Sequence, residues 1–431
     1  MMMTDSEDKK IYQFQEFTTS LEQYQMFKLN QKLIFLLQQN KFYQEKLKNI
    51  KLPITSKEDL KMLPFTMKQE LVEDQKMYPP YGRNHTYPIE SYSRYHQTSG
   101  TTGSPLKVLD TQDSWNWWIA CWQDVLKTSD VTYKDKVFLA FSFGPFIGFW
   151  AGFEAAKSIG AFVIAAGSQT SKERLATLME NDATVLLCTP SYALHLAEVA
   201  NEIELDLHKT SISKIITAGE PGGSIPSVRK QIEELWDATL FDHVGMTETG
   251  AFGYSCDAQN GLHINESQFI AEIIDPESLE PAKENEKGEL VLTNLGRYGY
   301  PLIRYRTGDM VINSQEKCSC SNDFLFLPGG ILGRADDMVV IRGINIYPSS
   351  IEAIVREFPE IIEFQITYYT KGDMDQIKVQ FELASDDNAT VQKVLETRLR
   401  ERVGLRIETE IVEQNSLPRF SMKAKRVIDN R

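Results

Sequence analysis

The sequence predicts an α/β fold: a large N-terminal domain of β-sheets flanked by helices, which also holds a smaller β layer, and a small mobile α+β C-terminal domain. Short apolar runs alternate with helical segments between about residues 90 and 300, as in a parallel or mixed sheet covered by helices. This pattern changes near residues 335–337. A single core rarely grows beyond about 250–300 residues. We therefore divide the 431-residue chain into predicted domains at residues 1–335 and 336–431.

The first predicted element is a helix. Residues 21–47 place Phe27, Ile34, Leu37 and Phe42 near one stripe, the pattern of an amphipathic helix, and Pro53 closes the segment. Four apolar runs then predict buried strands, and helical segments separate most of them. The predicted strands are residues 137–141, 161–166, 184–188 and 214–218, the helices are 171–181, 191–203 and 224–236, and the smaller β layer has strands at 269–274 and 288–293.

The C-terminal part has its own pattern. MVVIRG predicts a strand, and Ser349 or Ser350 is expected to cap the helix that follows. FQITYY and IKVQFEL predict two strands joined by a hairpin loop, followed by a helix at residues 390–402 and a last strand, RIETEIV. These elements predict a compact α+β unit.

Charge and composition exclude several classes of function. The net charge of -14 argues against a nucleic acid or an anionic membrane as the main partner. No apolar run approaches the ~18 residues that a membrane span needs, and the first ten residues lack an apolar signal region. We therefore expect a cytoplasmic protein. Five cysteines form no disulfide framework, and Cys121 and Cys188, which lie in apolar runs, are expected to be reduced core residues.

Residues 98–105, TSGTTGSP, form the strongest local motif. Glycines let backbone N–H groups converge on an anion, and hydroxyl groups add further donors. The order of residues differs from both the Walker A loop and the dinucleotide-binding fingerprint. The motif predicts phosphate binding; the alternative is a flexible turn.

Two weaker motifs follow. Residues 245–250, GMTETG, with Asp242 before them, place a carboxylate beside a hydroxyl on a glycine-flanked turn, which suits Mg²⁺ and phosphate. The alternative for this motif is a capped helix start. In RYRTGD, Asp309 on a tight turn can accept two ribose hydroxyls.

GRADD at residues 333–337 and PRFSMKAKR at residues 418–426 complete a set of five motifs. In this order the set resembles the adenylate-forming superfamily of acyl-CoA synthetases, adenylation domains and luciferases. The chain is most similar to the phenylacetate–CoA ligase family, because it is short and carries the segments MLPFTMKQEL, RYHQTSGTTGSP, CTPSYAL, AGEP, GLHI and PLIRYRTGD. The resemblance covers nearly the whole chain.

The resemblance implies a role for each matching residue. Lys423 would bridge the carboxylate and the α-phosphate, Glu248 would hold Mg²⁺, and Thr247 would touch the α-phosphate. A lysine and Mg²⁺ at the reacting phosphate would neutralise the charge that two approaching anions build up. The implied ATP- and AMP-binding residues are Thr98, Ser99, Gly100, Thr101, Thr102, Gly103, Ala218, Gly219, Glu220, Asp242, His243, Val244, Gly245, Met246, Asp309 and Arg334. The C-terminal domain would turn about Asp336 and bring Gly343 to the thiol channel.

Some positions depart from the family pattern. Val244 stands where an aromatic ring usually stacks on adenine, Met422 replaces a glycine before the catalytic lysine, and Ser104 replaces a frequent lysine. Lys425 competes with Lys423 for the catalytic role, and the spacing from Pro418 favours Lys423.

The stretch FSFGPFIGFW lies where this family builds its acyl pocket. Phe141, Phe143, Phe146 and Phe149 would form an aromatic wall with few charges, which suits an aryl acid. The alternative is that these rings are plain core.

A further set of residues predicts a metal site. Cys256, His263, Cys318 and Cys320 offer three thiolates and one imidazole, enough for a closed tetrahedral Zn²⁺ site of structural type. The alternative is three unrelated thiols and a surface histidine.

Together these features predict an aryl-acid–CoA ligase that uses ATP and Mg²⁺ to form an acyl-adenylate and then an acyl thioester on coenzyme A. A second hypothesis is a free-standing adenylation enzyme that loads an aryl or amino acid onto the phosphopantetheine of a carrier protein. A third is a non-catalytic nucleotide-binding protein, against which the intact Glu248, Asp309 and Lys423 argue. The sequence is also compatible with a homodimer.

Overall fold

The computed structural model describes residues 20–98, 105–145, 147–148, 150–335, 337, 339–341, 344–371, 374–384, 388–419 and 426–431. The helices are α3 (Leu21–Gln39), α4 (Lys41–Lys46), α5 (Lys68–Met77), α6 (Gln112–Thr128), α7 (Trp150–Ser158), α8 (Ser171–Glu180), α9 (Pro190–Glu202), α10 (Pro226–Trp236), α11 (Pro348–Val355) and α12 (Asn388–Val403). The strands are β1 (Tyr92–Gln97), β2 (Lys107–Thr111), β3 (Lys136–Leu139), β4 (Phe162–Ala165), β5 (Val185–Cys188), β6 (Lys214–Thr217), β7 (Thr239–Met246), β8 (Gly250–Tyr254), β9 (Gly261–Ile264), β10 (Phe269–Ile274), β11 (Lys287–Asn294), β12 (Tyr305–Ile312), β13 (Phe326–Pro328), β14 (Gly333–Arg334), β15 (Val339–Ile341), β16 (Ile344–Ile346), β17 (Ile361–Lys371), β18 (Met374–Leu383), β19 (Glu408–Ile411) and β20 (Val427–Asp429).

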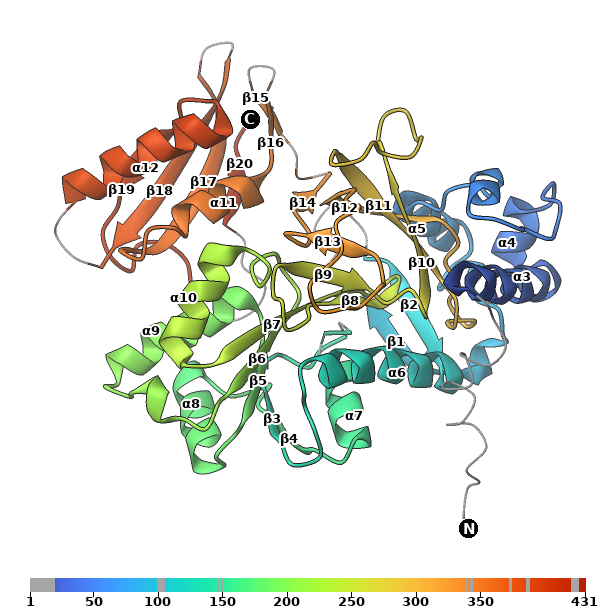
Figure 1. Cartoon of the computed structure of the whole chain (residues 1–431), viewed down its shortest axis with the longest axis horizontal. Helices are drawn as coiled ribbons and strands as arrows, with labels where there is room; N and C mark the ends of the chain where they lie inside the picture. Colours follow the sequence, from blue (N-terminus) through green and yellow to red (C-terminus); the bar gives the residue numbers. More distant parts are fainter. Residues whose placement is uncertain are drawn as a thin grey trace.

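An eight-stranded sheet forms the centre of the molecule (Figure 1). Its strand order is β13-β9-β8-β7-β6-β5-β3-β4. The run from β4 through β7 is parallel, and β8, β9 and β13 continue it in antiparallel pairing. The four predicted strands are β3 to β6, so the α/β prediction is confirmed, but β4 is an edge strand and is not buried.

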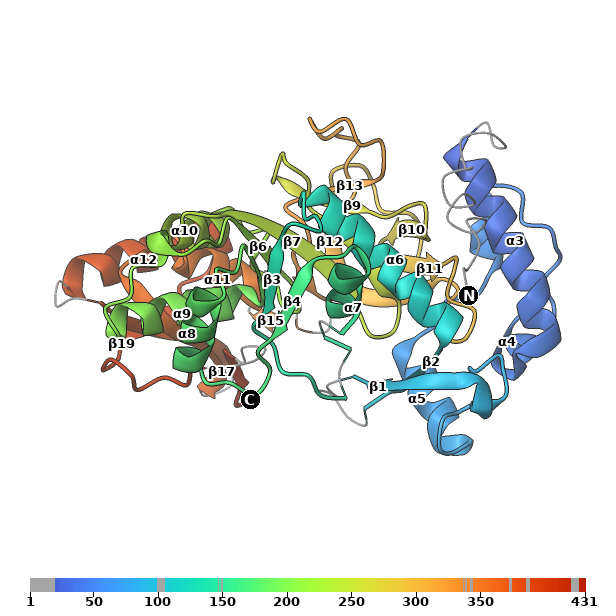
Figure 2. The same ribbon diagram turned by 90° about the horizontal axis from the view of Figure 1, so that it is seen from below.

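Helices cover both faces of the parallel strands, as Figures 1 and 2 show. Val137 and Leu139 of β3 pack in one core with α6 and α7, whereas Phe138 of the same strand packs in another with α8, α9 and α10. Successive side chains of a strand point to opposite faces, so a single apolar run supplies both cores. Cys121 and Cys188 are fully buried free thiols in these cores, as predicted.

The predicted first helix is divided at Asn40 into α3 and α4, and its predicted stripe is wrong for Phe27 and Ile34, although Phe42 is buried. Phe27 and Ile34 are 57% and 51% exposed, and α3 instead buries Leu29 and Leu33 on its other side. That side packs beside the antiparallel sheet β10-β11-β12-β14, the smaller β layer. A helix with apolar residues on two sides offers two candidate stripes, and the packing partner decides which is buried.

Lys32 of α3 is also fully buried. Its ammonium donates to the backbone carbonyls of Asn294, at 2.5 Å, and Arg297, at 3.0 Å, and to the side-chain oxygen of Asn294. Burial, together with the nearby Arg297 charge, lowers the pKa of Lys32 well below its usual value.

The C-terminal residues form a four-stranded sheet, β19-β18-β17-β20, with its own core. The predicted hairpin is β17–β18, and α12 and β19 also match the prediction. Two features differ. The cap of α11 is Tyr347, which makes no side-chain capping bond, and β20, which pairs in parallel with β17, was not predicted. The domain boundary at residues 335/336 remains a prediction. Among the described residues, no helix is both long and apolar enough to cross a bilayer.

Candidate functional site

Many predicted site residues lie at one edge of the parallel sheet. Phe141 follows β3, Ala218 to Glu220 follow β6, and Asp242 to Met246 end β7. Ligands of open α/β sheets bind at the carboxyl ends of the strands. This edge is therefore the candidate active site.

Hydrogen bonds close the two ends of the glycine-rich motif. Thr98 donates its N–H to the carbonyl of Leu106, at 3.0 Å, and its hydroxyl accepts from the N–H of Leu106, at 3.0 Å. Gln97 donates its N–H to the carbonyl of Pro145, which joins β1 to the phenylalanine-rich stretch. Ser99, Gly100, Thr101, Thr102 and Gly103 lie outside the described residues.

Thr247 and Glu248 lie in the turn of the β7–β8 hairpin, so this motif does not begin a helix. One side chain that the sequence did not identify supports the turn: Arg297 donates to the carbonyls of Thr247, at 3.0 Å, and Glu248, at 2.7 Å. The same guanidinium binds the Asp110 carboxylate in bidentate fashion, at 2.7 and 2.6 Å. Both members of this ion pair are completely buried.

The Glu248 carboxylate is 6% exposed and has a cationic partner. Lys68, the first residue of α5, places its ammonium 3.1 Å from this carboxylate. A buried carboxylate needs a compensating cation, and Lys68 supplies it here. The predicted role of Glu248 as a ligand of Mg²⁺ stays a prediction. The sequence did not identify Lys68, because a single lysine at the start of a helix belongs to no recognisable motif.

Asp309 and Arg334 are brought together by the pairing of β12 with β14. Arg334 donates to the Asp309 carboxylate at 3.3 Å. Gly308, which precedes Asp309, has φ +77°, and a Cβ there would lie 2.8 Å from the Arg334 guanidinium. The predicted tight turn at Asp309 is wrong: Gly308 and Asp309 lie within β12, where its pairing with β11 is irregular. The glycine permits this local backbone conformation.

Asp242 is half-buried and pairs with Thr217 of the β6 strand. Burial raises the pKa of Asp242 to about 6, although hydrogen bonds from Ser224 and Thr217, at 2.6 and 3.1 Å, oppose that rise. A Cβ on Gly223 would come within 2.4 Å of the carboxylate. Asp242 therefore helps to fix the segment after β6, and its predicted role in nucleotide binding stays a prediction.

The neighbouring His243 is a buried, neutral side chain. Burial lowers its pKa to about 4, and Nδ1 donates to the carbonyl of Gly253 at 2.8 Å. Its ring lies 4.3 Å from that of Trp122. Val244, Met246 and Ala218 are partly buried and pack on the same core.

Glu220 accepts a hydrogen bond from the N–H of Ser191, at 2.8 Å, which ties the segment after β6 to the start of α9. Gly219 has φ +95°, in the region that favours glycine. The predicted adenine-lining segment is thus held in a defined backbone conformation.

Two of the four predicted pocket phenylalanines are described. Phe141 and Phe143 are partly buried against the core, and the Phe143 ring lies 4.6 Å from Trp150 in an edge-to-face arrangement. A Cβ on Gly148 would lie 2.5 Å from the Phe141 ring, so the glycine lets the ring pack closely. Phe146 and Phe149 lie outside the described residues.

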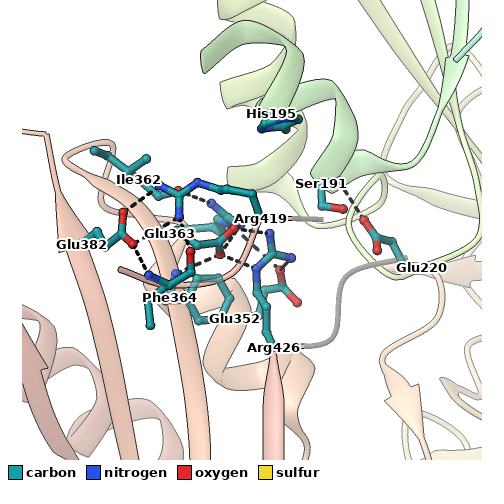
Figure 3. Close-up of polar contacts among 12 residues, drawn as sticks. Ser191, His195, Glu220, Glu352, Ile362, Glu363, Phe364, Glu382, Arg419 and Arg426 are labelled. Atoms are coloured by element: carbon teal, nitrogen blue, oxygen red, sulfur yellow. Dashed lines mark hydrogen bonds and ion pairs between the residues drawn. The ribbon is translucent and has the colours of Figure 1, made fainter. Parts of the chain in front are cut away.

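The C-terminal residues meet the large domain at α9 (Figure 3). Arg419 donates to Glu382, at 2.7 and 3.2 Å, and Arg426 donates to Glu363, at 2.5 and 3.0 Å. These arginines flank the predicted catalytic Lys423 in sequence. Lys423, Asp336 and Gly343 lie outside the described residues.

The four predicted zinc ligands form a cluster, and their ligand atoms all lie within 4.8 Å of one another. Cys256 follows β8, His263 belongs to β9, and Cys318 and Cys320 come from the segment before β13. The Sγ atoms of Cys256 and Cys318 are 3.4 Å apart, and Cys320 Sγ lies 3.3 Å from His263 Nε2.

Comparison with known proteins identifies two matching family profiles. The profile of the AMP-binding enzyme family matches residues 34–296, and that of the AMP-binding enzyme C-terminal domain matches residues 343–431. The phenylacetate-coenzyme A ligase of Pseudomonas putida is 30% identical, over 88% of this chain and 86% of that protein. The phenylacetate-coenzyme A ligase of Thermus thermophilus is 28% identical, over 87% and 88%.

Two solved structures of 2-hydroxyisobutyryl-CoA ligase, both 28% identical, are also similar. The structure in the postadenylation state with 2-HIB-AMP gives a TM-score of 0.88 and covers 94% of this chain and 89% of that one. The structure with 2-HIB-AMP and CoA in the thioesterification state gives 0.70 and covers 100% and 91%.

Replacing Arg297 should lower the stability of the folded protein. Arg297→Met leaves the Asp110 charge buried and unpaired, so we expect the free energy of unfolding to fall by about 3–5 kcal/mol. The double variant Asp110→Leu/Arg297→Met should lose less than Arg297→Met alone, because no uncompensated charge remains. Urea unfolding of the three proteins measures this difference.

Arg229→Met serves as the matched control. Arg229 pairs with Glu233 at 3.9 Å near the surface, where such pairs contribute about 0–1 kcal/mol. An Arg297→Met protein as stable as this control would contradict the assigned role of the buried pair.

Proposed function

The chain belongs to the AMP-binding enzyme family, and from that membership we propose that it is a ligase for an aromatic carboxylic acid. It is an AMP-forming acid–CoA ligase: it activates a carboxylic acid with ATP and forms the coenzyme A thioester. The substrate carboxylate attacks the α-phosphorus of ATP and releases pyrophosphate. The thiol of coenzyme A then attacks the acyl carbon, loses its proton and releases AMP.

The proposed nucleotide site uses residues from three segments of this chain. The Asp309 carboxylate would accept the ribose hydroxyls, with Arg334 holding its orientation at 3.3 Å. The observation that supports the site best is the Glu248 turn, which Arg297 fixes through two backbone carbonyls. Magnesium, when bound at Glu248, would neutralise phosphate charge. Lys68 then becomes free to face another anion.

The proposed second step needs a different arrangement of the C-terminal domain, turned about Asp336 so that Gly343 approaches the thiol. The TM-score of 0.88 with a postadenylation structure, against 0.70 with a thioesterification structure, supports a domain orientation like the former in the present structure. Loading of a carrier protein and a homodimer remain predictions.

An aromatic acid is proposed because rings surround the carboxyl edge of the sheet. Phe141, Phe143 and Trp150 are partly buried there, and Trp122 is fully buried beside the neutral His243. An α-ammonium in such surroundings would lack a carboxylate partner and would be penalised.

The acid preference is tested with a panel of acids. Benzoate and phenylacetate should have specificity constants higher than those of medium-chain fatty acids or amino acids, by roughly tenfold to a hundredfold, because two ring contacts add about 0.5–1.5 kcal/mol each. Phe143→Leu should reduce this preference, whereas Phe162→Leu, at a residue 59% exposed on β4, should not. ATP–pyrophosphate exchange measures the first step for each acid. A preference for fatty, hydroxy or amino acids would contradict the aromatic proposal.

The catalytic lysine is tested by separating the two steps. Lys423→Ala should lower adenylate formation by at least ~10²-fold, since one preorganised charge is lost. Thioester formation from a supplied acyl-adenylate should change little. If Lys425→Ala, the matched control, shows the loss and Lys423→Ala does not, the assignment is wrong.

We also propose that the cysteine–histidine cluster binds structural Zn²⁺. Zinc–sulfur bonds of about 2.3 Å place two tetrahedral sulfurs roughly 3.8 Å apart, close to the 3.4 Å between Cys256 and Cys318. His263 Nδ1 lies 3.2 Å from the carbonyl of Phe324, which can only accept, so Nδ1 carries the proton and Nε2 is left for the metal. Four protein ligands leave no open position for substrate.

Metal analysis of freshly purified protein should find about one zinc per chain. A chelator should lower the melting temperature, because bound zinc contributes folding free energy. The Cys320→Ser variant should melt lower and respond less to the chelator. Protein that holds no zinc yet matches the melting temperature of zinc-loaded protein would rule the site out.

A further inference from the structure

An ion pair joins the described C-terminal residues to the large domain. Glu198 of α9 places its carboxylate 3.5 Å from Nε of Arg419. The other guanidinium nitrogens of Arg419 are bound to Glu382 of β18, a carboxylate whose side chain is fully buried. Arg419 is therefore rigidly held within its own domain and presents only Nε to α9, as its position beside that helix in Figure 3 suggests.

A second guanidinium lies near the same carboxylate. Arg356 follows α11, its side chain is 4% exposed, and it forms ion pairs at 3.9 Å with Glu352 and Glu363 of its own domain. Burial and the nearby Arg426 charge lower the pKa of Arg356, and the charges of Glu363, Glu352 and, least of the three, Glu198 act in the opposite direction. Arg356, Arg419, His195 and Glu198 line one small cavity between the domains. Glu198 is thus an acidic side chain of α9 that lies beside two arginines of the C-terminal domain.

Weaker contacts also join the described residues of the two domains, among them the Lys287 ammonium, 5.1 Å from the centre of the Tyr347 ring. Ser227 of α10 donates to the carbonyl of Ala353 at 3.2 Å, and Ser349 donates to the carbonyl of Leu332. Hydroxyl–carbonyl bonds of this kind are readily exchanged for water. The Glu198–Arg419 pair, at 3.5 Å, links the orientation of the C-terminal domain to two specific opposite charges.

We propose that Glu198 is a positioning residue for the adenylation step, which it favours by holding Arg419 and hence the C-terminal domain in the orientation seen here. The proposal rests on the two-orientation scheme of the proposed function. Arg419 immediately precedes residues 420–425, so an orientation that fixes Arg419 also fixes the point from which the segment with Lys423 starts.

The pair is suited to form and break in every catalytic cycle. The side chains of Glu198 and Arg419 are 29% and 22% exposed, so both can be rehydrated when they separate. Pairs of partly exposed groups shift an equilibrium by only about twofold to fivefold. Such a weak contact can bias the orientation without trapping it.

The test uses charge substitutions at one helix position. Glu198→Gln should slow ATP–pyrophosphate exchange about twofold to fivefold. Glu198→Lys should slow it further, by roughly five- to twentyfold, because repulsion from two guanidinium groups replaces the attraction. Thioester formation from a supplied acyl-adenylate and coenzyme A should be unchanged or faster. Glu202→Lys, one turn further along α9 at an exposed residue, is the matched control and should change neither step.

A second measurement does not depend on catalysis. Spin labels attached through bioorthogonal side chains at the exposed positions Lys172 of α8 and Lys393 of α12 report the distance between the domains. In the ligand-free protein, Glu198→Lys should reduce the population of the orientation seen here, and Glu202→Lys should not.

Equal losses in both half-reactions, or unchanged distance populations in Glu198→Lys, would overturn the role of Glu198. A wild-type protein that exchanges pyrophosphate with no acid would instead contradict the proposed function, and the distance measurement would still decide the role of Glu198 in domain orientation.

Discussion

The catalytic region depends on the fully buried ion pair between Asp110 and Arg297. Two charges taken out of water are tolerated only when their hydrogen-bonding groups find partners. Arg297 meets this requirement with one carboxylate and the two backbone carbonyls of Thr247 and Glu248. The strand after the glycine-rich motif and the turn that carries Glu248 are thereby joined through one side chain. The core, and not the turn itself, fixes where Glu248 lies.

Local patterns predicted most of the fold. Short apolar runs became β3 to β6, and the hairpin β17–β18 followed from two β-branched and aromatic segments around a polar loop. The failures have a shared cause. Phe27 and Ile34 are apolar but exposed, and Ser349 donates to Leu332 instead of capping α11. In each case a partner distant in sequence decided between two locally acceptable arrangements.

Some residues of the candidate site could be predicted from sequence motifs, and others could not. Asp309 and Arg334 belong to recognisable motifs, and the β12–β14 pairing brings them together. Asp110, Arg297 and Lys68 belong to no motif, because a lone charged residue has no spacing to recognise. Asp110 and Arg297 are 187 positions apart, and only the folded chain makes them neighbours.

The attachment of α3 has a consequence for the cooperativity of the whole domain. Gln25 donates to the carbonyls of Glu266 and Phe269, and Lys32 donates to that of Arg297. Local opening of a structure follows units that share their hydrogen bonds. The N-terminal helix and the segment behind the catalytic turn therefore form one such unit. Proteolytic loss of this helix would disable the enzyme from a distance, by releasing the backbone on which the turn rests.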